Sequence, residues 1–172
     1  IQDILAMYQP DLIIHAAAYT AVDRAEDEPE LAMEINRNAV LNLANVAKEH
    51  NALLVHISTD YVFDGKGPLP YKEKETTNPA SVYGYTKALG ENEVLLSGAK
   101  YLIIRTSWLY SIYGDNFVKK IAHLSHERES LNVVFDQIGT PTWAADLASA
   151  LIEICGGYID DNEHFPYGIY HY

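Results

Sequence analysis

Three short apolar runs, at residues 12–18, 53–58 and 102–108, set the strongest constraint on the fold. None of them alternates between apolar and polar side chains, so each is typical of a strand buried on both faces of a parallel sheet. Helical patterns separate the runs, at residues 29–50 and 83–96. Strands that alternate with helices in this way predict an α/β fold built on a parallel sheet.

The other segments complete this pattern. The helix at residues 29–50 begins with a proline, which suits a first helical turn, and its apolar spacing predicts a buried face. That face comprises Leu31, Ile35, Ala39, Leu43 and Val46. We expect further helices at residues 1–9, 116–128 and 142–155, the last closed by Gly156-Gly157, and a strand at residues 131–135.

Composition narrows the class of partner. The net charge of −12 argues against nucleic acid or an anionic membrane as the main partner. No apolar run approaches the length of a membrane span. The single cysteine suits a reducing compartment. We therefore expect a cytoplasmic protein that binds neither nucleic acid nor membrane.

The predicted strand ends carry the polar chemistry. In open parallel sheets, ligands bind beyond the carboxyl ends of the strands. Here those ends carry residues 16–20, 58–60 and 106–108, and the helix bearing Tyr83 and Lys87 begins after the second strand. All of these groups meet at one edge of the sheet, which predicts a functional site there.

Tyr83 and Lys87 form the most specific pair within that site. Residues four apart share one face of a helix, so the ammonium is expected near the phenol. A nearby cation lowers the pKa of a tyrosine from its usual value of about 10. Such a tyrosine can give a proton to a carbonyl oxygen near neutral pH. Alone, the pair is a weak signal, because both residues are common on solvated helices.

Five segments in order along the chain resemble one family: residues 10–23, 58–65 (STDYVFDG), 82–91 (with YGYTK), 105–110 (RTSWLY) and 136–142. They are similar to the extended short-chain dehydrogenase/reductases that act on sugar nucleotides, and more closely to the dTDP-4-dehydrorhamnose reductases. The resemblance implies a Rossmann-like, doubly wound parallel sheet, incomplete at its N-terminus, with part of a small substrate-binding subdomain.

The same resemblance divides the chain by role. Residues 1–130 would form the dinucleotide-binding part with the catalytic residues, and residues 131–172 would contribute to the substrate-binding region. The implied reaction is the NADPH- or NADH-dependent reduction of the 4-keto group of dTDP-4-dehydro-6-deoxy-L-mannose to dTDP-L-rhamnose. A homodimer is compatible with the resemblance.

Individual roles follow from matching positions. Tyr83 would protonate the keto oxygen, Lys87 would lower the pKa of Tyr83 and bind the nicotinamide ribose, and Thr59 would hydrogen-bond the same carbonyl. Asp60 and Trp108 would contact the sugar. Close approach to the cofactor would come from a run of small side chains and its neighbours: Ala16, Ala17, Ala18, Tyr19 and Thr20.

Structural alternatives exist at several of these positions. The alanine run fits simple close packing, Thr59 fits a turn cap, and Trp108 fits a core residue. Asn36 matches an asparagine of the wider superfamily that helps to order the active site, but an exposed or capping asparagine fits as well, so it is not counted among the predicted site residues. His123 and His126 share a helix face without a third ligand, so no metal site is predicted.

The position after Asp60 separates related activities. Sugar-nucleotide 4,6-dehydratases typically carry a glutamate there, whereas this chain has Tyr61, which favours reduction over dehydration. An epimerase is not expected to carry the run at residues 59–63. Two alternatives stay open: a non-catalytic relative such as a regulatory subunit of methionine adenosyltransferase, and a reductase or epimerase of another deoxysugar nucleotide.

The family's glycine-rich turn, which cradles the cofactor pyrophosphate, is absent from this sequence. The residues that select NAD or NADP are absent with it. Without the preceding strand, the run at residues 12–18 would present an apolar sheet edge. We therefore expect residues 1–172, expressed alone, to be poorly soluble and inactive.

Overall fold

The computed structural model describes residues 4, 7–67, 69–133 and 137–172. The chain forms two compact units. The first comprises Ile1–Arg105 and Pro166–His171, and the second comprises Thr106–Phe165 with Tyr172. The first unit contains the main sheet and most of the predicted site residues.

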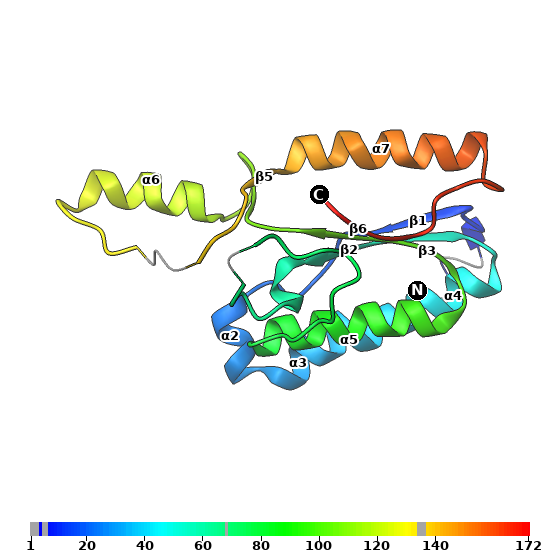
Figure 1. Ribbon diagram of the computed structural model, residues 1–172, viewed down its shortest axis with the longest axis horizontal. Helices are drawn as coiled ribbons and strands as arrows, with labels where there is room; N and C mark the ends of the chain where they lie inside the picture. Colours follow the sequence, from blue (N-terminus) through cyan, green and yellow to red (C-terminus); the bar gives the residue numbers. More distant parts are fainter. Residues whose placement is uncertain (1–3, 5–6, 68, 134–136) are drawn as a thin grey trace. The chain divides into compact units, whose positions relative to one another are not determined.

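A four-stranded sheet organises the first unit, in the order β1 (Leu12–His15), β2 (Leu53–Thr59), β3 (Lys100–Thr106) and β6 (Gly168–His171). The pairs β1–β2 and β3–β6 are parallel. Figure 1 shows the strands running together as one twisted sheet. The predicted α/β fold with a parallel, Rossmann-like sheet is confirmed.

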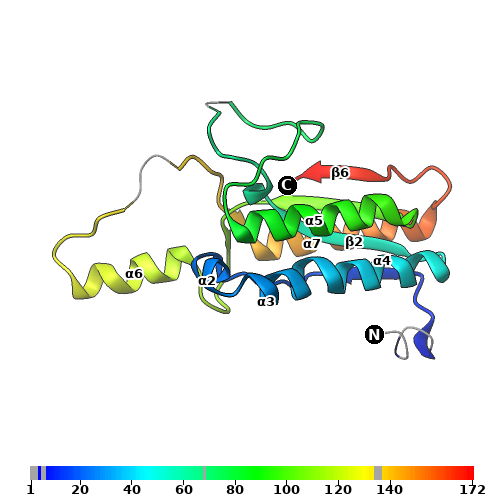
Figure 2. The same cartoon turned by 90° about the horizontal axis from the view of Figure 1, so that it is seen from below.

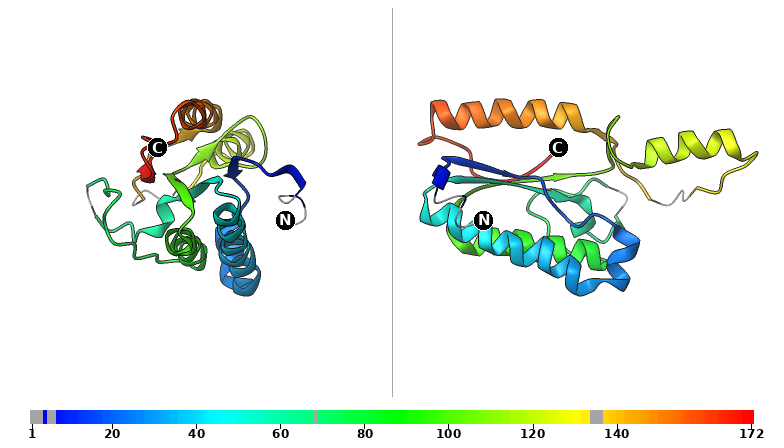
Figure 3. Two further views of the ribbon diagram at one scale, coloured as in Figure 1. Left: turned by 90° about the vertical axis from the view of Figure 1, so that its right-hand side faces the viewer. Right: turned by 180° about the vertical axis from the view of Figure 1, so that it is seen from behind.

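Helices connect the first three strands and lie together on one side of the sheet, as the end-on view in Figure 3 shows. Between β1 and β2 the chain forms α2 (Val22–Asp27), α3 (Pro29–Met33), the π-helical turn η1 (Glu34–Asn38) and α4 (Ala39–Glu49). The predicted helix at residues 29–50 is thus confirmed, with a π segment inside it, whereas α2 was not predicted.

The helix α5 (Val82–Ser97) follows β2 and the short 3-10 turn η2 (Asp60–Val62). The Ser81 hydroxyl caps its start by accepting a hydrogen bond from the Gly84 amide at 3.1 Å. Gly98 ends it in the left-handed conformation, with φ of 73°. In Figure 2, α4 and α5 lie side by side in front of the strands.

Small side chains line the contact between these helices and the sheet. Val46 is buried as predicted, but the rest of the predicted face of the long helix is displaced by one position: Leu31 is 48% exposed, whereas Ala32, Val40 and Ala44 are fully buried. The core there also contains Ala47 of α4, Ala52, Leu54 of β2, Val94 of α5, Ala99 and Ile103 of β3. Short side chains allow the helices to approach closely, and this close approach selects the buried face.

Two glycines of α5 permit the closest approaches. A Cβ on Gly90 would lie 2.2 Å from the Asn36 carbonyl oxygen, and a Cβ on Gly84 would lie 2.1 Å from the Tyr61 carbonyl oxygen. Both distances are far below van der Waals contact. The sequence of α5 therefore fixes its separation from η1 and η2.

The second unit contains a small parallel pair, β4 (Leu109–Tyr110) with β5 (Thr142–Trp143), and two helices, α6 (Phe117–Glu127) and α7 (Ala144–Asp160). The predicted helix α6 is confirmed. The third apolar run forms a strand only as far as Thr106, so Trp108 lies outside it.

The prediction that Gly156-Gly157 ends a helix is wrong, because α7 continues through both glycines to Asp160. Neither glycine has the positive φ of a helix-terminating residue. Of the strand predicted at residues 131–135, Leu131–Val133 are irregular, and Val134 and Phe135 lie outside the described residues. The helix predicted at residues 1–9 also lies largely outside them. Within the described part of the chain, no helix has the length and apolarity needed to span a bilayer.

The glycine contacts make a direct prediction about stability. Gly90→Ala should lower the free energy of unfolding by about 1–3 kcal/mol, because the added methyl group overpacks the contact with Asn36. Gly157→Ala is the matched control, because nothing lies within 4 Å of the added Cβ in α7. It should raise stability by about 0.5–1 kcal/mol. Urea denaturation of both variants checks this, and an equal response would contradict the close approach.

Candidate functional site

The predicted catalytic residues of the first unit meet at the carboxyl end of β2. Tyr83 and Lys87 lie on one face of α5 and are buried, with 9% and 2% of their surfaces exposed. The Lys87 ammonium donates a hydrogen bond of 2.7 Å to the Ile57 carbonyl oxygen. Thr59 ends β2 two residues later, and its side chain acts on the Tyr83 phenol by lowering the pKa of that group. The structure therefore brings together the three residues that the sequence placed apart.

Thr59 has both of the roles considered for it. Its hydroxyl oxygen accepts a hydrogen bond of 3.2 Å from the Tyr61 amide, so it caps η2. The same hydroxyl donates to the Asp60 carboxylate at 3.1 Å. These contacts hold the hydroxyl in place beside Tyr83. The turn cap thus positions the group that was predicted to face a substrate.

The predicted lowering of the Tyr83 pKa is not found. Burial raises the pKa of Tyr83 above its usual value, the Thr59 side chain opposes that rise, and the nearby Asp60 adds to it. The physical reason is that Lys87 points its ammonium at the Ile57 carbonyl rather than at the phenol. Tyr83 is consequently a neutral phenol at physiological pH, which is the form that donates a proton.

Two opposing effects set the pKa of the buried Lys87 ammonium. Burial lowers the pKa of Lys87 to about 8, and the nearby carboxylate of Glu91 opposes this effect. The ammonium is therefore mostly charged at neutral pH and loses its proton at mildly alkaline pH, as groups at functional sites often do.

The predicted cofactor segment follows β1 directly. Ala16, Ala17 and Thr20 are exposed, and Ala18 and Tyr19 are half-buried. The alanines are therefore not packed in a core, so the close-packing alternative fails for this run. The segment lies beyond the carboxyl end of its strand, where backbone groups are available to a ligand.

Asn36 fixes that segment and was missed as a site residue. Its side chain is 1% exposed. It accepts a hydrogen bond from the Tyr19 amide at 2.8 Å and donates to the Tyr19 carbonyl and the Thr86 hydroxyl, both at 3.1 Å. The alternative of an exposed or capping asparagine is thus wrong. Asn36 lies one helical turn from both Ala32 and Val40, and this spacing was the sequence signal that could have predicted its burial.

Two histidines lie beneath this edge of the sheet. His15 ends β1 and faces His56 of β2, with Nδ1 atoms 2.9 Å apart and stacked rings. Burial, together with the charge of Lys87, lowers the pKa of His15 to about 4 and that of His56 well below its usual value. Both rings are neutral at physiological pH, so one donates to the other and the end of β1 is joined to the middle of β2.

Tyr61 packs its ring edge against Tyr83, with 5.4 Å between ring centroids. It supplies no carboxylate beside the catalytic pair. Asp60 is the nearby acid, and burial raises its pKa.

Trp108 belongs to the second unit. It is 38% exposed and adopts a φ of 47°, an unusual conformation for a bulky residue. Its carbonyl accepts a hydrogen bond from the Thr142 amide at 3.3 Å, and Gly139 lies directly against its indole. Trp108 is therefore not a plain core residue. Backbone strain of this kind is typical of functional positions.

The described residues contain no group of three or more histidine, cysteine or acidic side chains arranged to hold a metal ion. His123 pairs with Glu127 at 3.3 Å instead.

Comparison with known proteins places this geometry in a family. The whole chain, residues 1–172, matches the RmlD substrate binding domain family. The chain belongs to this family. It is 47% identical over 169 residues to the dTDP-4-dehydrorhamnose reductase of Aggregatibacter actinomycetemcomitans, covering 98% of this chain and 57% of that protein. It is 46% identical over 162 residues to the reductase of Sinorhizobium fredii, covering 94% of this chain and 55% of that protein.

A solved structure of this family has the same fold. The Bacillus anthracis dTDP-4-dehydrorhamnose reductase in complex with NADP superimposes with a TM-score of 0.91 at 44% identity. The match covers 99% of this chain and 58% of that one. The chain thus spans somewhat more than half the length of the RmlD-family proteins that it resembles.

The histidine pair predicts how stability depends on pH. Because the pKa of His15 is about 4 in the folded chain and 6.5 for a free histidine side chain, its stabilising contribution is present above pH 6.5 and is lost as pH falls towards 4. Between pH 7.5 and 5, wild type should lose about 1–2 kcal/mol more stability than His15→Asn. The exposed His126→Asn should behave as wild type. Urea denaturation at several pH values measures this, and parallel curves for all three would contradict the buried neutral pair.

Proposed function

We propose that the chain carries the proton-transfer site of an NADPH- or NADH-dependent reductase that converts dTDP-4-dehydro-6-deoxy-L-mannose to dTDP-L-rhamnose. The observation that carries this proposal is the buried cluster of Thr59, Tyr83 and Lys87 at one sheet edge. The reductase names of the relatives support the same reaction and disfavour a non-catalytic regulatory role.

Tyr83 is the proton donor. Its phenol is neutral because burial raises its pKa, so the proton is available for a carbonyl oxygen that becomes an alkoxide on reduction. Thr59, turning its O–H from the Asp60 carboxylate to the substrate, donates a second hydrogen bond to the same oxygen and stabilises its developing charge. The Thr59 side chain acts on the pKa of Tyr83, which supports a position in which one substrate oxygen can meet both groups.

The residues present fit a nicotinamide cofactor. The exposed Ala16 and Ala17 let a ligand approach the backbone closely, and Asn36 holds the neighbouring Tyr19 in position. Lys87 uses one N–H for Ile57 and has others for the ribose hydroxyls. When bound, NADPH or NADH supplies the hydride that reduces the carbonyl carbon.

Asp60 and Trp108 contact the sugar in this proposal, Trp108 through its partly exposed indole face. Tyr61 offers no carboxylate for removing a proton from the sugar, which favours reduction over water elimination. The reaction takes place in the cytoplasm, and a homodimer stays a prediction.

Replacing the proton donor tests the proposal. In the full-length protein, Tyr83→Phe should lower kcat by about 10²–10⁴-fold, because general acid catalysis is lost. The KM for NADPH should change little. Tyr85→Phe is the matched control on the same helix, since Tyr85 is 53% exposed, and it should keep wild-type turnover. Oxidation of NADPH in the presence of the dTDP-4-keto sugar measures both, and near-normal turnover of Tyr83→Phe would reject Tyr83 as the donor.

A further inference from the structure

A third residue of α5 continues the face that carries Tyr83 and Lys87. Glu91 lies one turn beyond Lys87 and is 2% exposed. Its carboxylate accepts hydrogen bonds from Arg105 Nε at 2.9 Å and Arg105 Nη2 at 2.6 Å, and from the Ser58 hydroxyl at 2.5 Å. A buried carboxylate on the helix is thus bound to two neighbouring strands.

The contacts of this helix face fall on consecutive residues of β2. Lys87 binds the carbonyl of Ile57, Glu91 binds the hydroxyl of Ser58, and Tyr83 meets Thr59. Any shift of the helix along the strand would break all of them together. Glu91 therefore acts on the same alignment that places the catalytic hydroxyl and ammonium.

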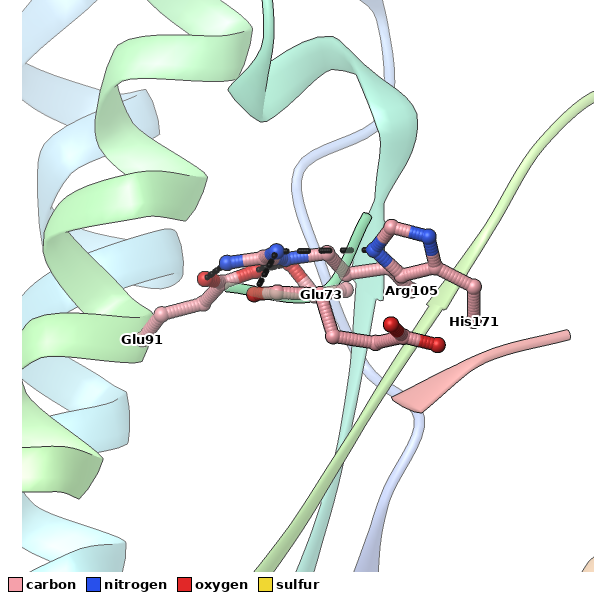
Figure 4. A network of polar contacts seen from close by, with 5 residues as sticks. Glu73, Glu91, Arg105 and His171 are labelled. Carbon is pink, nitrogen blue, oxygen red and sulfur yellow. Dashed lines mark hydrogen bonds and ion pairs between the residues drawn. The ribbon is translucent and has the colours of Figure 1, made fainter. Parts of the chain in front are cut away.

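Arg105 serves this alignment and is not a free cation. Figure 4 shows its guanidinium held between Glu91 and His171, with Glu73 contributing its backbone carbonyl. Nη1 donates to the Glu73 carbonyl at 3.3 Å and lies 3.5 Å from His171 Nε2. The guanidinium also lies 5.0 Å from the centre of the Phe63 ring. The pair borders a cleft of about 890 Å³, lined by residues 72–77, α5 and β6. Because Arg105 already has protein partners, the pair does not act as a ligand site for that cleft.

We propose that Glu91, held by Arg105 and Ser58, is a positioning residue for the reductase site: it aligns the turn of α5 that carries Lys87 and keeps a carboxylate beside the buried ammonium. This inference rests on the proposed function for its link to turnover. Glu91 touches neither substrate nor cofactor in this account.

The charged surroundings of Lys87 make this effect measurable. The titratable groups whose charges interact with Lys87 are Glu91 from α5, His56 from β2 and His15 from β1, while Tyr83 lies one turn earlier on α5. Arg105 from β3 reaches it through Glu91, and Asp60 from η2 lies on the Tyr83 side. Both histidines are neutral at physiological pH. Glu91 is therefore the anion that opposes the effect of burial on Lys87.

The test uses the full-length protein and three variants. Glu91→Gln removes the charge, and Glu91→Asp keeps it on a shorter side chain. Glu93→Gln is the matched control, because Glu93 lies on the same helix and pairs with Arg37 at 2.8 Å, away from Lys87. The Lys87 ammonium is titrated by NMR of 13C-labelled lysine without substrate, with Lys87→Arg to assign the signal. The pH profile of kcat is measured with NADPH and the dTDP-4-keto sugar.

In Glu91→Gln, the Lys87 titration and the high-pH limb of kcat should both move down by about one pH unit. Turnover at pH 9 should then fall about tenfold relative to wild type, with a smaller loss at pH 6.5. Glu91→Asp should shift less, and Glu93→Gln should not shift. If Glu91→Gln does not fold, Glu91→Asp decides, because a shift in the same direction supports the proposal and an unchanged titration overturns it.

An unchanged Lys87 titration in folded Glu91→Gln would reduce the pair to a packing role and overturn the inference. Absence of turnover in wild type would reject the proposed function instead. The titration would still decide the role of Glu91, so the two failures are distinguishable.

Discussion

The attachment of α5 to the end of β2 is the interaction on which the site depends. Lys87, Glu91 and Tyr83 contact three consecutive residues of the strand, and each contact is buried and polar. Buried polar groups are costly unless they are satisfied, so this arrangement tolerates little displacement. A helix held in this way can place a hydroxyl and an ammonium within the narrow geometry that proton transfer needs.

Close packing supplies the other half of that rigidity. Gly84 and Gly90 bring α5 against the backbone of η2 and η1, where no side chain larger than glycine fits without movement. Through the second contact, the same helix approaches Asn36, which holds the segment after β1 by two backbone hydrogen bonds. The helix α5 and the predicted cofactor segment are therefore parts of one packed body.

The sequence was informative where a single physical pattern decides the structure. Continuous apolar runs predicted β1, β2 and β3. The rule that ligands bind beyond the carboxyl ends of parallel strands predicted that Thr59 lies near Tyr83 and Lys87. Prediction from the sequence failed where packing between distant segments determines the structure. The buried face of the long helix follows small residues and Asn36 rather than Leu31, because Gly90 lets α5 come close. The pKa of Tyr83 depends on where Lys87 points, and spacing alone does not give that direction. Gly156 and Gly157 lie inside α7, although two consecutive glycines predicted the end of that helix.

The central claim is that Thr59 and Tyr83 bind one and the same substrate oxygen. A crystal structure of the full-length protein with oxidised NADP and dTDP-L-rhamnose tests it most directly. We expect the Tyr83 Oη and Thr59 Oγ1 atoms each to lie within about 3.2 Å of the O4 atom of the sugar. An O4 atom bound by other side chains, with Tyr83 beyond hydrogen-bonding distance, would contradict it.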